Sequence, residues 1–205
     1  MIYFTSDNHF GHDNIVKWTA RKWKTVEEMD EGLIKRWNGT VKESDTVIVV
    51  GDFAFSNSTR RTEILSRLNG TKILVRGNHD KVGVNPLGFD LVVDELTMNI
   101  AKQPVTIKHY PLKSGFFLGL SYKFRATRFV KRWVPTLYKR LPRYLDRMPL
   151  NKGQYHIHGH THSTEKFREN QIHVGCEAWD CTPVSLTKIS AYIQSRESKR
   201  RSKIK

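Results

Sequence analysis

The feature of the sequence that most constrains the fold is a series of short runs rich in Val, Ile, Tyr and Thr, which are typical of β-strands. Between the early runs, residues 26–37 place apolar side chains on one helical face, and residues 58–68 form a second predicted helix that ends before Asn69-Gly70. Strands that alternate with helices predict an α/β sheet. The strand-like runs are residues 1–6, 46–50, 72–76, 105–108, 155–158 and 171–175.

Residues that can bind a metal ion stand at the downstream end of nearly every strand-like run. In open α/β sheets, ligands bind outside the carboxyl ends of the strands, so we expect these groups to converge on one site. Each fragment alone is a weak signal, but five fragments in order, each ending a predicted strand, have little purely structural purpose. The fragments are Asp7-Asn8-His9, Gly51-Asp52, Gly77-Asn78-His79-Asp80, His109 and Gly159-His160-Thr161-His162.

The net charge of +15 is confined to two segments of the chain. Residues 113–152 hold eleven Lys or Arg and one acid, and residues 196–205 hold six Lys or Arg and one acid. The remainder of the chain has 18 basic and 18 acidic residues and is therefore neutral. Charge that is confined in this way favours a polyanionic partner over a general role in solubility.

Residues 113–152 also interrupt the alternation of strands and helices. They carry eight aromatic residues, and Pro135, Pro142 and Pro149 limit helices there to short pieces. We expect a basic, aromatic, helical insertion that forms a lid or a substrate wall, although a solvated hairpin explains the charge equally well. The chain is otherwise predicted to be one domain over residues 1–195, followed by a basic mobile tail at 196–205.

The cellular location is predicted from two negative observations. No apolar run approaches the roughly 20 residues that a membrane span needs. The N-terminus has no charged leader and no small-residue cleavage site, so we interpret it as the first strand and not as a signal peptide. We therefore expect a cytoplasmic protein.

The series of metal-binding fragments resembles that of the calcineurin-like metallophosphoesterases, whose pattern is D-x-H, G-D, G-N-H-D/E, H and G-H-x-H. The resemblance runs from Met1 to about Ile189, and both ends of this range are similar to a small bacterial and phage branch of the superfamily. Residues 113–152 and the tail lie outside it. The resemblance implies a four-layer α/β/β/α sandwich, a dinuclear metal site and hydrolysis of a phosphoester by a metal-bound hydroxide.

The resemblance also implies a ligand set for two metal ions that share one carboxylate, Asp52. Carboxylate, imidazole and amide donors suit Mn, Fe, Ni, Co or Zn, among which Mn is favoured. One ion would be held by Asp7, His9, Asp52 and His162, and the other by Asp52, Asn78, His109 and His160.

His79 has no ligand role in this scheme. We predict that it donates a proton to the leaving oxygen or stabilises charge there, and that Asp80 orients its imidazole. His12 lies one turn beyond His9, and we predict that it either touches substrate or has a helix-start or hydrogen-bonding role.

Two substrate classes compete for this predicted phosphodiesterase. A nucleotide or nucleic acid is favoured, because Arg125, Arg128 and Arg132 stand among aromatic residues, and Arg and aromatic rings suit phosphates and stacked bases. The alternative is a lipid-linked pyrophosphate at an anionic membrane surface. The UDP-diacylglucosamine pyrophosphatases carry a similar insertion, but they have Arg where this chain has His79 and HGD where it has His109-Tyr110-Pro111. A nucleic-acid-binding module with a vestigial site is disfavoured by the complete ligand set, and no protein partner can be inferred.

Overall fold

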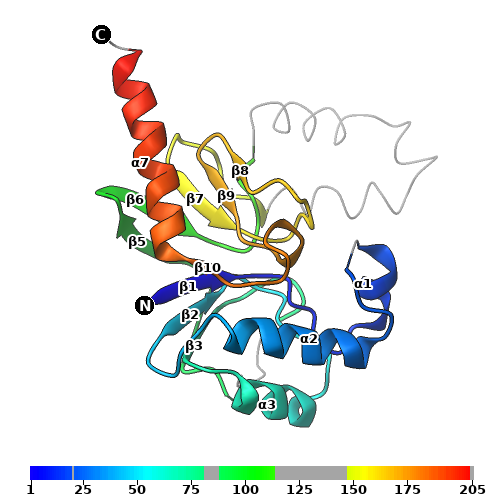
Figure 1. Cartoon of the computed structure of the whole chain (residues 1–205). Helices are drawn as coiled ribbons and strands as arrows, with labels where there is room; N and C mark the ends of the chain where they lie inside the picture. The colour runs from blue at the N-terminus through cyan, green and yellow to red at the C-terminus, as the bar shows by residue number, and fades with distance from the viewer. Residues whose placement is uncertain (20, 81–87, 114–146, 204–205) are drawn as a thin grey trace, which may run out of the picture.

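The chain folds into two five-stranded sheets that pack face to face, with helices flanking them (Figure 1). A computed structural model describes residues 1–19, 21–80, 88–113 and 147–203. The first sheet has the order β10-β1-β2-β3-β4, with all neighbours parallel except β10. Its strands are β1 (Ile2–Thr5), β2 (Thr46–Val49), β3 (Thr71–Val75), β4 (Leu91–Val93) and β10 (Val184–Ser185).

The second sheet is mixed and has the order β5-β6-β7-β9-β8. β6, β7 and β9 run parallel to one another, whereas β5 and β8 pair antiparallel with their neighbours at the two edges. The strands are β5 (Leu96–Ile100), β6 (Gln103–Ile107), β7 (Tyr155–His158), β8 (Phe167–Arg168) and β9 (Gln171–His173).

Three of the helices begin at a side-chain cap. The side chains of Thr25, Asn57 and Ser185 accept a hydrogen bond from the backbone N–H three residues later, at the starts of α2, α3 and α7. The helices are α1 (Asp13–Trp18), α2 (Val26–Asn38), α3 (Ser58–Arg67) and α7 (Leu186–Ser202), and a 3₁₀ turn, η1, covers Cys176–Ala178. No helix among the described residues is long and apolar enough to cross a membrane.

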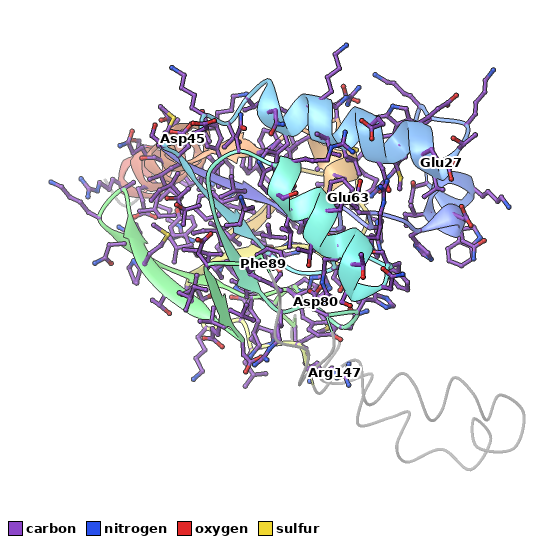
Figure 2. All side chains as sticks on the ribbon, turned by 90° about the horizontal axis from the view of Figure 1, so that it is seen from below. Glu27, Asp45, Glu63, Asp80, Phe89 and Arg147 are labelled. Atoms are coloured by element: carbon purple, nitrogen blue, oxygen red, sulfur yellow. The ribbon has the colours of Figure 1, made fainter. Side chains whose placement is uncertain are left out.

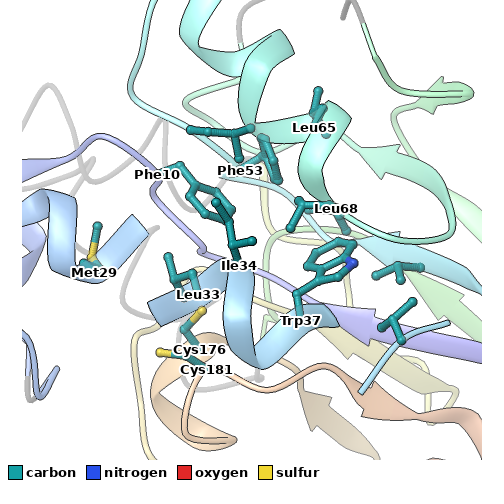
Figure 3. Packing of buried hydrophobic residues seen from close by; sticks show 14 of the residues in the cluster. Phe10, Met29, Leu33, Ile34, Trp37, Phe53, Leu65, Leu68, Cys176 and Cys181 are labelled. Carbon is teal, nitrogen blue, oxygen red and sulfur yellow. The ribbon is translucent and has the colours of Figure 1, made fainter. Parts of the chain in front are cut away.

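One hydrophobic core lies between the first sheet and helices α2 and α3. α2 presents Leu33, Ile34 and Trp37 on its inner face, where they meet Phe10 and Leu68 (Figure 3). The thiols of Cys176 and Cys181 are free and buried at the rim of this cluster. The amphipathic spacing predicted for residues 26–37 is therefore confirmed. The contact of α2 with Phe10 also holds the segment that follows β1 in place.

A second core lies between the two sheets. It combines Phe4 and Val50 from the first sheet with Ile107 and Ile157 from the second. α7 closes this core with Ile189 and Ile193, and Tyr192 on the same helix stacks on Phe167, with ring centroids 3.9 Å apart. The two sheets are thus held at a fixed distance, so the loops at their carboxyl ends can share one site.

The predicted α/β class is confirmed, and each strand-like run identified in the sequence contains a strand. The predicted four-layer α/β/β/α order stays a prediction for its second helical layer, because α7 packs into the core that both sheets share. The expected insertion at 113–152 falls mainly on residues 114–146, outside the described residues, and Arg125, Arg128 and Arg132 lie outside them with it.

The predicted mobile tail needs a correction, because α7 continues through it to Ser202. Glu197 accepts a hydrogen bond from the Tyr155 hydroxyl at 2.7 Å and pairs with Arg200 one turn later at 3.0 Å. Residues 196–202 contain no Pro or Gly, so nothing in the backbone stops the helix where the charge becomes dense.

Candidate dinuclear metal centre

The predicted ligand residues lie on loops that leave the carboxyl ends of neighbouring strands. The β1 loop is tied to the β2 loop by backbone hydrogen bonds from Asp7 to Gly51 at 3.0 Å and from His9 to Asp52 at 3.1 Å. The β7 loop joins them, because the His160 amide donates to the Asp7 carboxylate at 2.9 Å. Loops from both sheets therefore meet at one place.

Backbone strain is concentrated at these positions. Five of the seven predicted ligands have a left-handed backbone, with φ between 49° and 71°. Non-glycine residues adopt this conformation uncommonly, and strain of this kind gathers at functional sites. The five residues are Asp7, His9, Asp52, His160 and His162.

Two groups of three side chains have the geometry to hold a metal ion. Asp7, His9 and His162 place one ligand atom each within 4.8 Å of one another. Asp52, His109 and His160 do the same. The sequence-based assignment of these six residues to two ions matches this grouping.

Asp52 lies between the two groups. Its Oδ2 is 3.4 Å from Nε2 of His109 in its own group and 3.9 Å from Nε2 of His9 in the other. The Asn78 Oδ1 atom lies 3.0 Å from the same His109 nitrogen, so the amide oxygen faces the second group. This arrangement fits the bridging role predicted for Asp52 and the ligand role predicted for Asn78.

His9 provides the best test of whether these residues fit a metal ion. Its side chain is 3% exposed, and neither of its ring nitrogens has a hydrogen-bond partner among the described residues. Buried polar atoms are nearly always hydrogen-bonded, so an unpartnered imidazole beside two carboxylates needs an explanation. A bound cation would satisfy one of the two nitrogens, because a neutral imidazole offers one lone pair to a metal.

The charge states of the groups differ, and a metal ion would have to displace a proton from His109 in order to bind there. Burial opposes ionisation of Asp52, but the hydrogen bond and charge of His109 prevail and lower the pKa of Asp52 to about 2. Burial also opposes protonation of His109, yet Asp52 and Asp7 raise the pKa of His109 to about 9. Burial lowers the pKa of His9 to about 3 and that of His160 to about 4. His9 and His160 are therefore neutral at physiological pH and keep a lone pair available.

Two glycines allow the close approach of these groups. Gly51 has φ +87°, and a Cβ atom there would overlap the His109 ring. A Cβ atom at Gly77 would overlap the Asp52 side chain and amide. A side chain at either place would displace a predicted ligand.

His79 lies at the open side of the site, as its predicted role requires. Its side chain is 43% exposed, and its Nε2 is 3.9 Å from Asp52 Oδ2. Its backbone N–H donates to Asp52 Oδ1 at 2.9 Å, which fixes the loop and leaves the imidazole facing outward.

The role predicted for Asp80 needs a correction. Asp80 is labelled in Figure 2, where side chains are drawn as sticks. Its carboxylate accepts from the backbone N–H groups of Asp52 at 2.7 Å, Gly77 at 2.8 Å and Phe53 at 3.3 Å. No hydrogen bond joins it to the His79 imidazole among the described residues. Asp80 therefore holds the loops after β2 and β3 together, because amides of both loops point at its side chain.

His12 occupies the position before α1, but its side chain makes no capping hydrogen bond. Its ring instead stacks on Phe55, with centroids 4.1 Å apart and planes 14° apart. It also lies 5.3 Å from the His9 ring. Of the two roles predicted for His12, this position fits the substrate contact better than the helix start.

A buried ion pair behind the first group was missed from the sequence. The Arg21 side chain, 1% exposed, donates from Nε and Nη2 to Glu177 Oε1 at 3.1 and 3.0 Å. Its Nη1 and Nη2 also donate to the backbone carbonyls of Asn8 at 2.7 Å and Asp7 at 2.6 Å. Arg21 thus fixes the backbone between two predicted ligands.

Glu177 connects this pair to His162, because its Oε2 lies 3.2 Å from His162 Nδ1. Burial opposes the charge on Glu177, but His162 and Arg21 lower the pKa of Glu177 to about 2. A carboxylate behind the imidazole leaves Nε2 facing the site and increases its basicity. The sequence did contain a signal for this residue, since Glu177 follows the β9 strand as the predicted ligands follow theirs.

Comparisons with known proteins agree with this geometry. A model of the Calcineurin-like phosphoesterase superfamily domain matches residues 1–176. The Gene 66 protein of Mycobacterium phage L5 is 27% identical over 204 residues, covering 86% of this chain and 86% of the phage protein. The Gene 66 protein of Mycobacterium phage D29 is 28% identical over 194 residues, covering 89% and 92%.

Two further relatives match different extents of the chain. An uncharacterized protein of Methanocaldococcus jannaschii is 45% identical over 84 residues, covering 40% of this chain and 48% of that protein, so the match spans about half of its length. A crystal structure of a protein of unknown function from Aquifex aeolicus superposes with a TM-score of 0.64 at 26% identity. That match covers 94% of this chain and 98% of the Aquifex chain, so both share one fold over nearly their whole length.

Proposed function

This chain belongs to the calcineurin-like phosphoesterase superfamily, and from that premise we propose that it is a dinuclear metal-dependent phosphodiesterase acting on a nucleotide or nucleic-acid phosphoester. The observation that carries the proposal is the buried, unpartnered imidazole of His9, which belongs to one of two neighbouring carboxylate-imidazole groups. In this proposal Asp7, His9 and His162 hold one ion, and Asp52 is shared with the other. Asn78, His109 and His160 complete the ligand set of the second ion.

Two divalent ions, when bound, would activate a water molecule and neutralise the phosphoryl oxygens. The donor set contains nitrogen and oxygen atoms only, which suits Mn, Fe, Co, Ni or Zn, and we propose Mn. His79 is the one predicted catalytic group that is exposed and outside both metal-binding groups. It supplies the proton to the leaving oxygen, while Asp80 keeps its loop in place.

The proposal of a nucleotide or nucleic acid is supported by the charge of the chain. The net charge is +15, and the excess is carried by residues 113–152 and 196–205, whereas the rest of the chain has equal numbers of basic and acidic residues. Polyanions are attracted to such an excess of positive charge over long range. A lipid-linked pyrophosphate would also be attracted, so the same assay must include it.

The decisive experiment is a screen of the purified protein, with and without added Mn²⁺, against cyclic nucleotides, nucleotides, RNA, DNA and lipid pyrophosphates. We expect hydrolysis of a diester that depends on metal and stops in excess chelator. Asp52→Ala serves as the inactive variant and Glu43→Ala, an exposed acid on a distant loop, as its matched control. Full activity in excess chelator would refute the metal-dependent reaction.

A further inference from the structure

Two exposed aromatic side chains flank the mouth of the metal centre. Five large hydrophobic residues are strongly exposed among those the structure describes, and two of these are aromatic: Trp18, 72% exposed, and Phe55, 40% exposed. Neither belongs to the two hydrophobic cores. Exposed aromatic surface is unfavourable in water, and where it gathers it marks a binding site.

These side chains form a continuous row of rings with His12 and His79. Phe55 lies 4.1 Å from the His12 ring and 4.3 Å from the His79 ring, measured between centroids. Trp18 stands edge-on to His12 at 5.9 Å. Phe55 also lies 5.4 Å from the ring of His9. We call Trp18, His12 and Phe55 the aromatic ledge; it starts one ring away from a predicted metal ligand and from the predicted proton donor.

The backbone under the ledge is fixed by contacts that do not use these rings. The Phe55 N–H donates to the Phe10 carbonyl at 2.8 Å, and α1 is anchored by buried Ile15. Packing therefore accounts for the positions of the two chain segments but not for aromatic side chains that point outward. A ligand held against the ledge would bury them.

We propose that the aromatic ledge binds the base of a nucleotide substrate while its phosphate lies at the metal centre. This inference rests on the proposed function and adds the group that the enzyme recognises. Flat rings favour a base because every base has a π-face, and stacking of this kind tolerates different bases. His12 adds ring nitrogens beside the stacking surface, which suits the polar edge of a base better than an acyl chain.

The test uses two diesters with the same leaving group, thymidine 5′-(p-nitrophenyl phosphate) and methyl p-nitrophenyl phosphate. Only the first carries a nucleoside, so their ratio of kcat/KM reports recognition of the base together with its deoxyribose. We expect Phe55→Ala and Trp18→Ala to lower this ratio by roughly 5- to 150-fold, the range measured for loss of one base–aromatic stack. The conservative variants Phe55→Tyr and Trp18→Phe should restore most of the ratio.

Leu91→Ala is the matched control, because Leu91 is 47% exposed on β4 and contributes no ring to the ledge. It should leave the ratio unchanged. Equal losses of kcat/KM with both diesters in the ledge variants would leave the ratio unchanged, place the leaving group on the ledge and overturn the assignment of the base. Unchanged kcat/KM values for both diesters would overturn the ledge itself.

Calorimetric binding of thymidine 5′-monophosphate and of methyl phosphate tests the ledge without catalysis. Wild-type protein should bind the nucleotide more tightly, and the two alanine variants should lose that difference. If wild-type protein hydrolyses neither diester with any metal, the proposed function fails, and the binding difference still decides on the ledge. Equal binding of both phosphates by wild-type protein, with Trp18-dependent binding to anionic vesicles, would assign the ledge to lipid instead.

Discussion

Replacing Glu177 with glutamine should weaken metal binding at the group formed by Asp7, His9 and His162 by roughly 10- to 100-fold, the usual effect of removing the partner of a ligating histidine. Glutamine keeps the shape of the side chain and changes only its charge and one acceptor. The cause would be the lost contact between Glu177 Oε2 and His162 Nδ1, which are 3.2 Å apart. Nothing in the substitution touches a ligand atom directly.

The contacts give the same magnitude by a second route. Arg21 donates to one carboxylate oxygen of Glu177, and His162 faces the other oxygen. Glutamine has one oxygen and one NH₂ group, so one of these two partners would face a donor in place of an acceptor. If His162 Nδ1 donates to Glu177 Oε2 across their 3.2 Å separation, a hydrogen bond to this charged group contributes about 1.5–3 kcal/mol. A 10- to 100-fold change in affinity equals about 1.4–2.8 kcal/mol, so the two estimates agree.

Folding stability should fall as well, and it must be measured separately. Removing one partner of a buried ion pair costs about 3–5 kcal/mol when the other charge is left uncompensated. Here the loss should lie at or below the lower end, because Arg21 keeps its hydrogen bonds to the carbonyls of Asp7 and Asn8. Urea unfolding of the metal-free protein measures this loss of folding free energy separately from metal binding.

The assay is competition of Mn²⁺ or Zn²⁺ between the folded protein and a coloured chelator, with stoichiometry checked by elemental analysis. Asp180→Asn is the matched control, since Asp180 is an exposed acid near Glu177 that pairs with Arg36 and Lys22. The control should bind two ions with wild-type affinity. If Glu177→Gln lowered stability but left affinity for both ions unchanged, the contact with His162 would have no role in metal binding.

Three further outcomes are expected. Asp52→Ala should abolish turnover and reduce bound metal, because its carboxylate lies between both groups; retention of two tightly bound ions by elemental analysis would contradict the bridging role. His79→Gln should keep both ions and slow turnover by roughly 10²–10⁴-fold, less with a good leaving group, and a parallel loss of metal would show that His79 is a ligand. Replacing residues 122–146 with a Gly/Ser bridge should leave turnover of a small aryl diester largely unchanged. It should reduce the slope of log K against log salt concentration for nucleic-acid binding by about 0.7–0.9 for each phosphate contact that is lost. An unchanged slope would mean that the segment is only solvated and contacts no phosphate.

The sequence by itself determined the central strands and the composition of the site. β1, β2, β3 and β7 follow from local runs of β-branched and aromatic residues, which fit a buried pleated surface. The predicted ligands were also identified locally, because each follows a strand within a few residues. Chain direction and parallel pairing then bring the ligands of each sheet to one edge, whereas the packing of the two sheets brings the two edges together.

The edge strands were harder to predict from the sequence. β5 has the burial of a half-exposed strand, with alternating exposed and half-buried residues from Leu96 to Asn99, and its weakly apolar sequence gives little signal. β8 and β10 have two residues each, which is too short for any periodicity. Their pairing depends on the adjacent strands, β9 and β1, whose outer backbone N–H and C=O groups need hydrogen-bond partners.

Only the tertiary structure decided which side chains support the site. Arg21 and Glu177 are 156 residues apart, and Phe55 meets His12 and His79 only after three loops have been brought together. Asp80 stands next to His79 in the sequence, yet its carboxylate binds amides of the loop after β2. Such contacts depend on loop closure and on the packing of two sheets, whose energies are properties of the whole chain, whereas strand propensity and ligand chemistry are properties of a few neighbouring residues.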